Sequence, residues 1–136
     1  MTDADLVRKK LAFIQTCLED LRRKARVDLI ETDVRELRFV EHTLQVAIQA
    51  VIDIASHIVS DDRLGEPTTN RELFTLLARG GLLPTELVDP MRRMAGFRNI
   101  LVHAYTEVDP MVLKDVVVNH VGDLEAFSRE IAKLLR

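Results

Sequence analysis

The sequence has one cysteine, no tryptophan, five phenylalanines and one tyrosine, with five glycines and four prolines among 136 residues. The single thiol, Cys17, excludes a disulfide framework and a cysteine-based zinc site, and it is typical of a reducing cytosol. So few turn residues argue against a β-protein, whose short strands need frequent turns.

The chain also lacks an excess of positive charge, with 19 Lys and Arg against 22 Asp and Glu and a formal net charge of -3. This balance argues against a protein that holds nucleic acid by bulk charge, but it allows a local basic site. The polar N-terminal stretch has no signal-peptide core, and we expect no apolar run long enough to span a bilayer. With 47% hydrophobic and 30% charged residues, we expect one soluble, cytoplasmic domain over residues 1–136.

The apolar residues recur every three or four positions, which is the period of a helix. This spacing predicts long helices over 2–26, 32–59 and 82–105, a short helix over 71–81, and a last long helix from Pro110 to Leu134. The expected N-caps are Thr2, Asn70 and Asp109. Pro90 either kinks the fourth segment or begins a new helix with Asp89 as its cap. The sequence therefore predicts an all-α, up-and-down bundle of four long helices plus one short helix.

One polar stripe lies on the second predicted helix, where Arg38, His42, Gln45, Gln49, Asp53 and His57 share a face. The stripe is either a solvated face or a polar groove wall or hydrogen-bonded seam. A metal site built from His42, Asp53 and His57 is rejected because the two histidines lie about four helical turns apart. We expect no metal and no cofactor.

A second polar group lies between residues 91 and 105, which include Arg92, Arg93 and Arg98 and no acidic residue. This composition predicts a local positive field. On an ideal helix, Arg98 and His103 are separated by about 140°, so they converge only if the helix frays or bends or if a second subunit supplies the mate. Taken without context, the same residues also fit a capping histidine and a surface arginine.

The stretch RNILVHAY resembles the Arg-x4-His-x-Tyr signature of the HepT-like branch of the HEPN superfamily. The blocks QVAIQAVIDIASHIV, LGEPTTNRELFTLLARGGLLP and MAGFRNILVHAY, in that order, extend the resemblance from the second helix to the end of the chain. It implies a HEPN-like, two-fold dimer that acts as the toxin of a type VII-like toxin–antitoxin system. It also implies a metal-independent ribonuclease, encoded beside an MNT-type nucleotidyltransferase antitoxin that silences it by AMPylation of the motif tyrosine.

Carried onto this sequence, the resemblance implies that Arg98 and His103 are catalytic and that Tyr105 is the AMPylated residue. Asn99, directly after the arginine, and Asp53, the best-placed acid of the second helix, are the expected supporting residues. The expected partners are an RNA substrate (tRNA or mRNA), a second copy of the chain and the antitoxin.

The chemistry of these residues suits RNA cleavage. A histidine side chain has an ordinary pKa of about 6.5 and can accept or donate a proton near neutral pH. An arginine offers a fixed fork of donors to phosphoryl oxygens. One histidine does not easily act as both base and acid, so we expect a composite site at the dimer interface and a 2′,3′-cyclic phosphate product.

A different class of function remains open. HEPN domains also serve as non-catalytic subunits that bind nucleotide or substrate for a nucleotidyltransferase. Such a subunit needs Arg98 for a phosphate but has no need of proton transfer, so the presence of His103 favours the enzyme.

Overall fold

The computed structural model describes residues 3–103 and 108–135, except for the side chain of His103. Its elements are α1 (Ala4–Arg23), the 3-10 helix η1 (Val27–Leu29), α2 (Val34–Asp61), α3 (Asn70–Arg79), α4 (Thr85–His103), α5 (Pro110–Asn119) and α6 (Val121–Leu134). The described residues form helices and connecting turns, with no strand among them. The predicted all-α class is confirmed.

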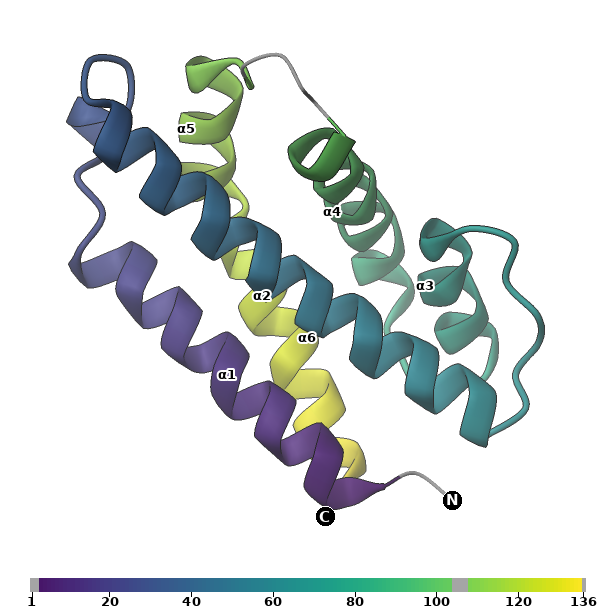
Figure 1. The fold of residues 1–136 in the computed structure, drawn as a ribbon. Helices are drawn as coiled ribbons and strands as arrows, with labels where there is room; N and C mark the ends of the chain where they lie inside the picture. The colour runs from purple at the N-terminus through teal and green to yellow at the C-terminus, as the bar shows by residue number, and fades with distance from the viewer. Residues whose placement is uncertain (1–2, 104–107, 136) are drawn as a thin grey trace.

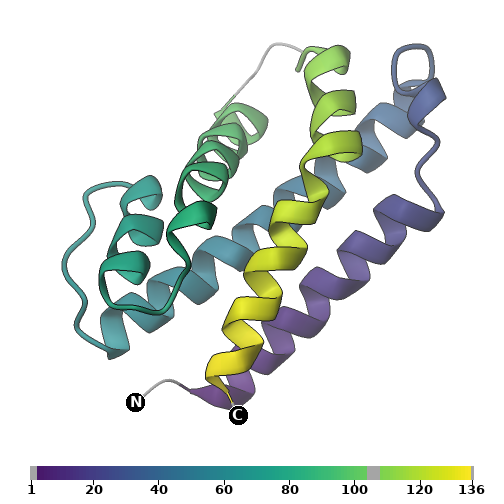
Figure 2. The ribbon, with the colours of Figure 1, turned by 180° about the vertical axis from the view of Figure 1, so that it is seen from behind.

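Helix α2 is the centre of the bundle, with α1 and α6 packed along one side and the α3–α4 pair along the other (Figure 1). The view from behind shows α5 and α6 following one another along the bundle (Figure 2). The ring of Phe74 on α3 meets Phe127 on α6 edge to face, with ring centroids 5.8 Å apart. Arg8 Nη2 donates to the carbonyl oxygen of Leu135 at 3.1 Å, which holds the start of α1 beside the end of α6. These contacts close one core around α2.

The central place of α2 explains its composition. By length and apolar content it is long enough to cross a membrane, contrary to our expectation from the sequence, but most of that stretch is buried inside the bundle. A helix packed on several sides must be apolar over most of its circumference. Its apolar character is therefore that of a core helix, and Cys17 of α1 is buried in the same core.

The helix N-termini follow the capping rules with small shifts from the predicted positions. Asp109 caps α5 by accepting from Met111 N, with Pro110 following, as predicted. Thr2 lies outside the described residues, and Asp3 caps α1. Thr69, not Asn70, caps α3, because Thr69 has the extended backbone that a cap requires. Helix α3 ends at the glycine pair, as expected, with Gly81 at a φ of +77°.

The prediction of one long final helix was wrong. The chain leaves the helical conformation at His120 (φ -123°, ψ -6°), which ends α5 and begins α6. Asn119 and Gly122, two residues of low helix propensity, flank this point. The bundle therefore has α1, α2, α4 and α6 as its longer helices and two shorter ones, α3 and α5.

Of the two alternatives for Pro90, a kink or a new helix, the new helix is wrong. Helix α4 begins at Thr85 and includes Pro90, so Asp89 is a helical residue and not a cap. Pro90 lies in the second turn, where its missing N–H removes a single intrahelical hydrogen bond. The result is one continuous helix that carries the whole stretch from Thr85 to His103.

Candidate functional site at the end of helix α4

Arg98 lies on the side of α4 that packs into the bundle. Its neighbours on this side, Met94, Ala95 and Leu101, are buried, and Arg98 itself is half-buried. Its Nε is fully buried and has no hydrogen-bond partner in the described part of the chain. Nη1 donates to Asn99 Oδ1 at 3.3 Å. The structure thus brings together two of the predicted site residues, Arg98 and Asn99.

The other two motif residues are less fully described. His103 is the last residue of α4, and its side chain is outside the described part. Tyr105 also lies outside the described residues. Because α4 stays helical through His103, positions 98 and 103 retain the separation of about 140° that an ideal helix imposes.

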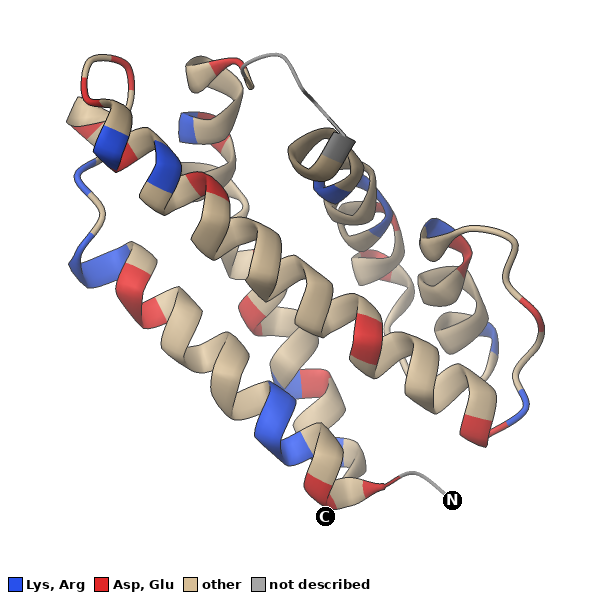
Figure 3. Cartoon of the chain, viewed as in Figure 1, with Lys and Arg blue, Asp and Glu red and all other residues tan. Residues whose placement is uncertain are grey.

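A groove of about 870 Å³ lies between α3 and the opposite side of α4. Its lining consists of the polar residues Arg71, Asp89, Arg92, Arg93 and Asn99 together with Gly96, Phe97 and Ile100. We call this surface the arginine groove. Three arginines against one aspartate make it cationic, although the whole chain has a net charge of -3. The basic positions on α3 and α4 are all arginines and lie among a few acidic ones, whereas the middle of α2 is mostly uncharged (Figure 3).

The packing of α3 on α4 fixes two of these arginines. Arg92 Nη1 donates to Thr75 Oγ1 at 2.9 Å and to the carbonyl oxygen of Arg71 at 3.4 Å. The guanidinium group of Arg71 lies against Gly96, where a methyl group would come within 2.7 Å of Arg71 Nη2. Gly96 therefore leaves the space that lets Arg71 lie along α4.

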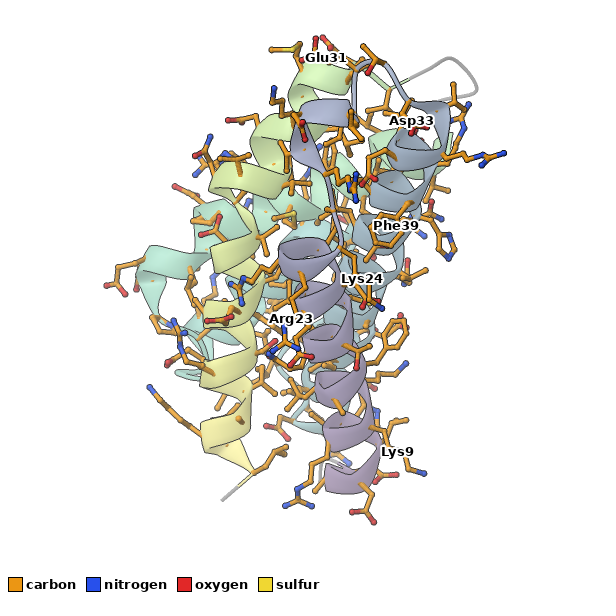
Figure 4. The ribbon with its side chains drawn as sticks, turned by 90° about the vertical axis from the view of Figure 1, so that its left-hand side faces the viewer. Lys9, Arg23, Lys24, Glu31, Asp33 and Phe39 are labelled. Carbon is orange, nitrogen blue, oxygen red and sulfur yellow. The ribbon has the colours of Figure 1, made fainter. Side chains whose placement is uncertain are left out.

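Four arginines of this region have no ion-pair partner, a property that they share with Arg23, Arg26, Arg35, Arg63 and Arg79 in the described part of the chain. Within residues 3–103 and 108–135, no carboxylate lies within 4.0 Å of the guanidinium groups of Arg71, Arg92, Arg93 and Arg98. By contrast, Arg22 pairs with Glu125, and Lys24 pairs with Asp20 at 3.2 Å. Arg23 and Lys24 project outward at the end of α1, where cations stabilise a helix (Figure 4). Two members of the basic run on α1, Arg22 and Lys24, thus have structural partners.

Asp53, the expected supporting acid, lies where α2 packs on α1. Its Oδ2 lies 3.4 Å from Lys10 Nζ on α1, and its Oδ1 accepts from Gln49 Nε2 at 2.8 Å. These recorded contacts join α2 to α1 and do not include Arg98. A supporting role for Asp53 in catalysis stays a prediction.

The polar stripe of α2 divides into two parts. Arg38 and His42 are exposed, as a solvated face requires. Further along, Gln49, Asp53 and His57 are half-buried, and His57 Nε2 lies 3.1 Å from Asp61 Oδ2 and 3.2 Å from Asp3 N. The interpretation as a hydrogen-bonded seam is therefore confirmed for the C-terminal half of the α2 stripe. The interpretation as a solvated face is confirmed for its N-terminal half. The described residues hold no cluster of three potential metal ligands.

Cys17 is not part of a reactive site. The thiol is buried, and burial, with a smaller effect from Asp20, raises its pKa above the ordinary value. A thiol held protonated in this way is a poor nucleophile.

Sequence reasoning missed Arg71 and Gly96. The positive field around Arg92 and Arg93 was visible in the sequence, but Arg71 lies on another helix, and only the packing of α3 on α4 brings it there. The spacing of Arg92, Gly96 and Asn99 by four and three residues was the available signal, because it places them on one side of α4.

Comparison with solved structures defines the class of protein. The structure matches the tri-AMPylated HEPN toxin of Shewanella oneidensis, solved in complex with an MNT antitoxin, with a TM-score of 0.86 and 34% sequence identity, and the match covers 98% of this chain and 99% of that chain. The bundle therefore has the fold of a HEPN toxin.

Comparison of sequences narrows this class to one family. The model of the family described as Ribonuclease HepT-like matches residues 14–131. The mRNA nuclease HepT of Shewanella oneidensis is 35% identical over 124 residues, which cover 90% of this chain and 93% of that protein. The tRNA nuclease HepT of Aphanizomenon flos-aquae is 32% identical over 107 residues, which cover 77% and 73%. The chain belongs to the HepT-like family, as its motif predicted.

Proposed function

We propose that this protein is the toxin of a type VII-like toxin–antitoxin pair, a metal-independent ribonuclease that cleaves tRNA or mRNA in the cytoplasm. The observation that carries the proposal is the environment of Arg98, five residues before His103 on α4. It is a half-buried cation hydrogen-bonded to Asn99, with no carboxylate partner in the described chain. Such a cation suits an anionic ligand. The names of the HepT relatives support RNA as that ligand.

The proposed reaction is an internal transesterification. His103 accepts the proton of a ribose 2′-OH, and the oxygen attacks the adjacent phosphorus. The bond from phosphorus to the 5′-oxygen breaks, and that oxygen takes a proton from His103 of the partner subunit. Arg98 donates hydrogen bonds to the phosphoryl oxygens as charge develops on them. The products carry a 2′,3′-cyclic phosphate and a 5′-hydroxyl.

A two-fold dimer supplies what one chain lacks in this scheme. General base and general acid are needed at once, and one histidine does not easily perform both roles. The continuous helix through His103 supports this arrangement, because it keeps positions 98 and 103 on different sides of α4. A cleft between two subunits allows Arg98 of one to act with the histidine of the other.

Asn99 and Asp53 are the proposed supporting residues. Asn99 accepts from Arg98 Nη1 and so holds the guanidinium group in one orientation. Asp53 is anchored by Lys10 and Gln49, so any part it takes in catalysis acts through the position of α2. The substitutions of Asn99 and Asp53 described below test both roles.

The proposed silencing of the ribonuclease is AMPylation of Tyr105. An MNT-type antitoxin transfers AMP from ATP: the tyrosine oxygen attacks the α-phosphorus, and pyrophosphate leaves. The new phosphodiester adds negative charge and acceptor oxygens two residues from His103, where it competes with RNA for Arg98. The AMPylated toxin of Shewanella oneidensis supports this proposal.

The test is RNA cleavage in EDTA by protein whose intact mass shows no added AMP, beside His103→Ala and Arg98→Ala. We expect cleavage by the wild-type chain, cyclic-phosphate ends, and loss in both variants by at least about 100-fold. No cleavage of tRNA or mRNA by an unmodified dimer would instead favour a non-catalytic subunit that binds nucleotide or substrate.

A further inference from the structure

The side of α4 that forms the arginine groove also carries the position of the catalytic histidine. Arg92, Gly96 and Asn99 follow one another at intervals of four and three residues, and the next interval of four reaches position 103. The backbone is helical through this position. The groove therefore runs along α4 toward the end where the proposed chemistry takes place, whereas Arg98 lies on the bundle side.

The guanidinium groups of the groove have donors left for a ligand. Both recorded hydrogen bonds of Arg92 use Nη1, and both of its partners are neutral oxygens. Arg71 and Arg93 are exposed, and within the described chain neither has an ion-pair partner. Asp89 is the one carboxylate of the lining. Unpaired arginines in a row bind a ligand that repeats its negative charge, and guanidinium forks match phosphate oxygens.

We propose that the arginine groove binds the phosphodiester backbone of single-stranded RNA and leads it to the position of His103. This inference rests on the proposed ribonuclease function and assigns the substrate path, through Arg71, Arg92 and Arg93. Phosphate contacts position a nucleic acid without reading its sequence. The groove thus sets how RNA enters the site and leaves base preference to other parts of the protein.

Gly96 offers a variant that separates binding from folding. In Gly96→Ala, the atoms nearest to the new methyl group outside α4 all belong to the guanidinium group of Arg71, so the methyl group displaces the flexible end of that side chain. Alanine has a higher helix propensity than glycine, so α4 itself gains stability. RNA binding then falls while the melting temperature stays level or rises.

The test measures binding of a fluorescein-labelled 2′-O-methyl oligouridylate by anisotropy. This probe keeps the phosphates but lacks the attacking 2′-OH, so binding is measured with intact wild-type protein whether or not it cleaves RNA. For Arg71→Ala/Arg93→Ala we expect about tenfold weaker binding and a slope of log K against log salt reduced by about 1.4, since each contact to a single strand contributes about 0.7. Gly96→Ala weakens binding several-fold. Arg79→Ala, at the end of α3 and outside the groove, is the matched control and binds like wild type.

Two comparisons decide the outcome. If the double variant and Gly96→Ala both show the affinity and salt slope of Arg79→Ala, the groove is not the RNA path, even when the wild-type chain cleaves RNA. If binding depends on the groove but the unmodified wild-type chain cleaves no RNA, the groove stands and the ribonuclease proposal fails. Should the double variant not fold, Gly96→Ala gives the decision alone.

Discussion

The polar residues of α2 and those of α4 differ in how their charges are compensated. Those of α2 share one face, whereas Arg98 and the arginine groove lie on opposite sides of α4. On α2, Asp53 is held by Lys10 and Gln49, and His57 lies beside Asp61. On α4, Arg98 has a buried Nε without a partner in the described chain. Of the groove arginines, Arg92 donates to neutral oxygens, and Arg71 and Arg93 have no ion-pair partner among the described residues. The half-buried charged groups of the α2 stripe thus have partners within the protein, although Gln49 Oε1 is buried without one, whereas the arginines of α4 have no ion-pair partner in the described chain.

This difference gives a criterion that separates a polar face with a structural role from a polar face that binds a ligand. Burying or ordering a charged group costs free energy unless a partner compensates it. A stripe whose charges are compensated internally contributes to the packing of helices. Cations that lie together without ion-pair partners are free to accept an anionic ligand, and phosphate has the matching charge and geometry for the ligand that we propose.

The largest expected effect comes from replacing Arg98 by an apolar side chain of similar length. Arg98→Met removes a half-buried cation, so we expect cleavage to fall by at least about 100-fold, while the melting temperature stays level or rises by up to about 3 °C. Cleavage and thermal unfolding of the same preparations test both parts. Arg79→Met is the matched control and changes neither. A clearly lower melting temperature for Arg98→Met would show that Arg98 stabilises the fold. The contrast between the internally paired charges of α2 and the unpaired arginines of α4 would then be wrong.

A smaller effect follows from giving Arg98 the carboxylate that it lacks. Asn99 Oδ1 accepts from Arg98 Nη1 at 3.3 Å, so Asn99→Asp places a negative charge at the same distance with little change in shape. The pair then competes with phosphate, and we expect about tenfold slower cleavage. Asn99→Ala removes one hydrogen bond, and about threefold slower cleavage is expected. If Asn99→Ala cleaves RNA as slowly as Asn99→Asp, the added negative charge is not the cause of the slower cleavage.

The helices and most of their ends could be predicted from the sequence because their signals are local. Asp109 with Pro110, the glycine pair after α3 and the apolar period of α1 and α2 act within a few residues. The break at His120 was missed because the apolar spacing continues across it, and only the backbone shows the turn. Pro90 was overrated as a helix start because in a second turn it costs a single hydrogen bond.

The sequence predicted the motif residues of the candidate site but not the surface that surrounds them. The sequence identified Arg98 and Asn99 together, and the structure joins them by a hydrogen bond. Arg71 and Gly96 depend on how α3 packs on α4, which no local pattern encodes. Similarly, Asp53 was a candidate because of its place on α2, and only its contact with Lys10 revealed an alternative role.

The seam on α2 is tested by a double-mutant cycle between Asp53 and Lys10. The two side chains are 42% and 33% exposed, so water screens the pair, and we expect a coupling of about 0.5 kcal/mol in the free energy of unfolding. Urea unfolding of Asp53→Asn, Lys10→Met and the double variant measures it. If Asp53 is purely structural, the three variants cleave RNA alike. Slower cleavage in Asp53→Asn and not in Lys10→Met would establish Asp53 as a supporting residue of the site.

The smallest expected effect is a pH dependence of stability at an internally paired carboxylate, Glu125 on α6. The hydrogen bond from Arg22 on α1 lowers the pKa of Glu125 below its ordinary 4.5, aided by the charges of Arg22 and Arg129 and opposed by burial. A lowered pKa in the folded state stabilises the fold above pH 4.5, and this contribution is lost as the pH falls further, through the folded-state pKa. Both side chains are partly exposed, so the contribution is less than about 1 kcal/mol. Glu125→Gln should therefore unfold slightly more easily than wild type at pH 7, and the difference should fade in acid. Thermal unfolding across pH measures this difference.

The proposed RNA binding by the groove depends on arginines that stay charged throughout this range, so Glu125→Gln should leave RNA binding unchanged. A loss of RNA binding in Glu125→Gln would mean that the internally paired charges also serve the substrate.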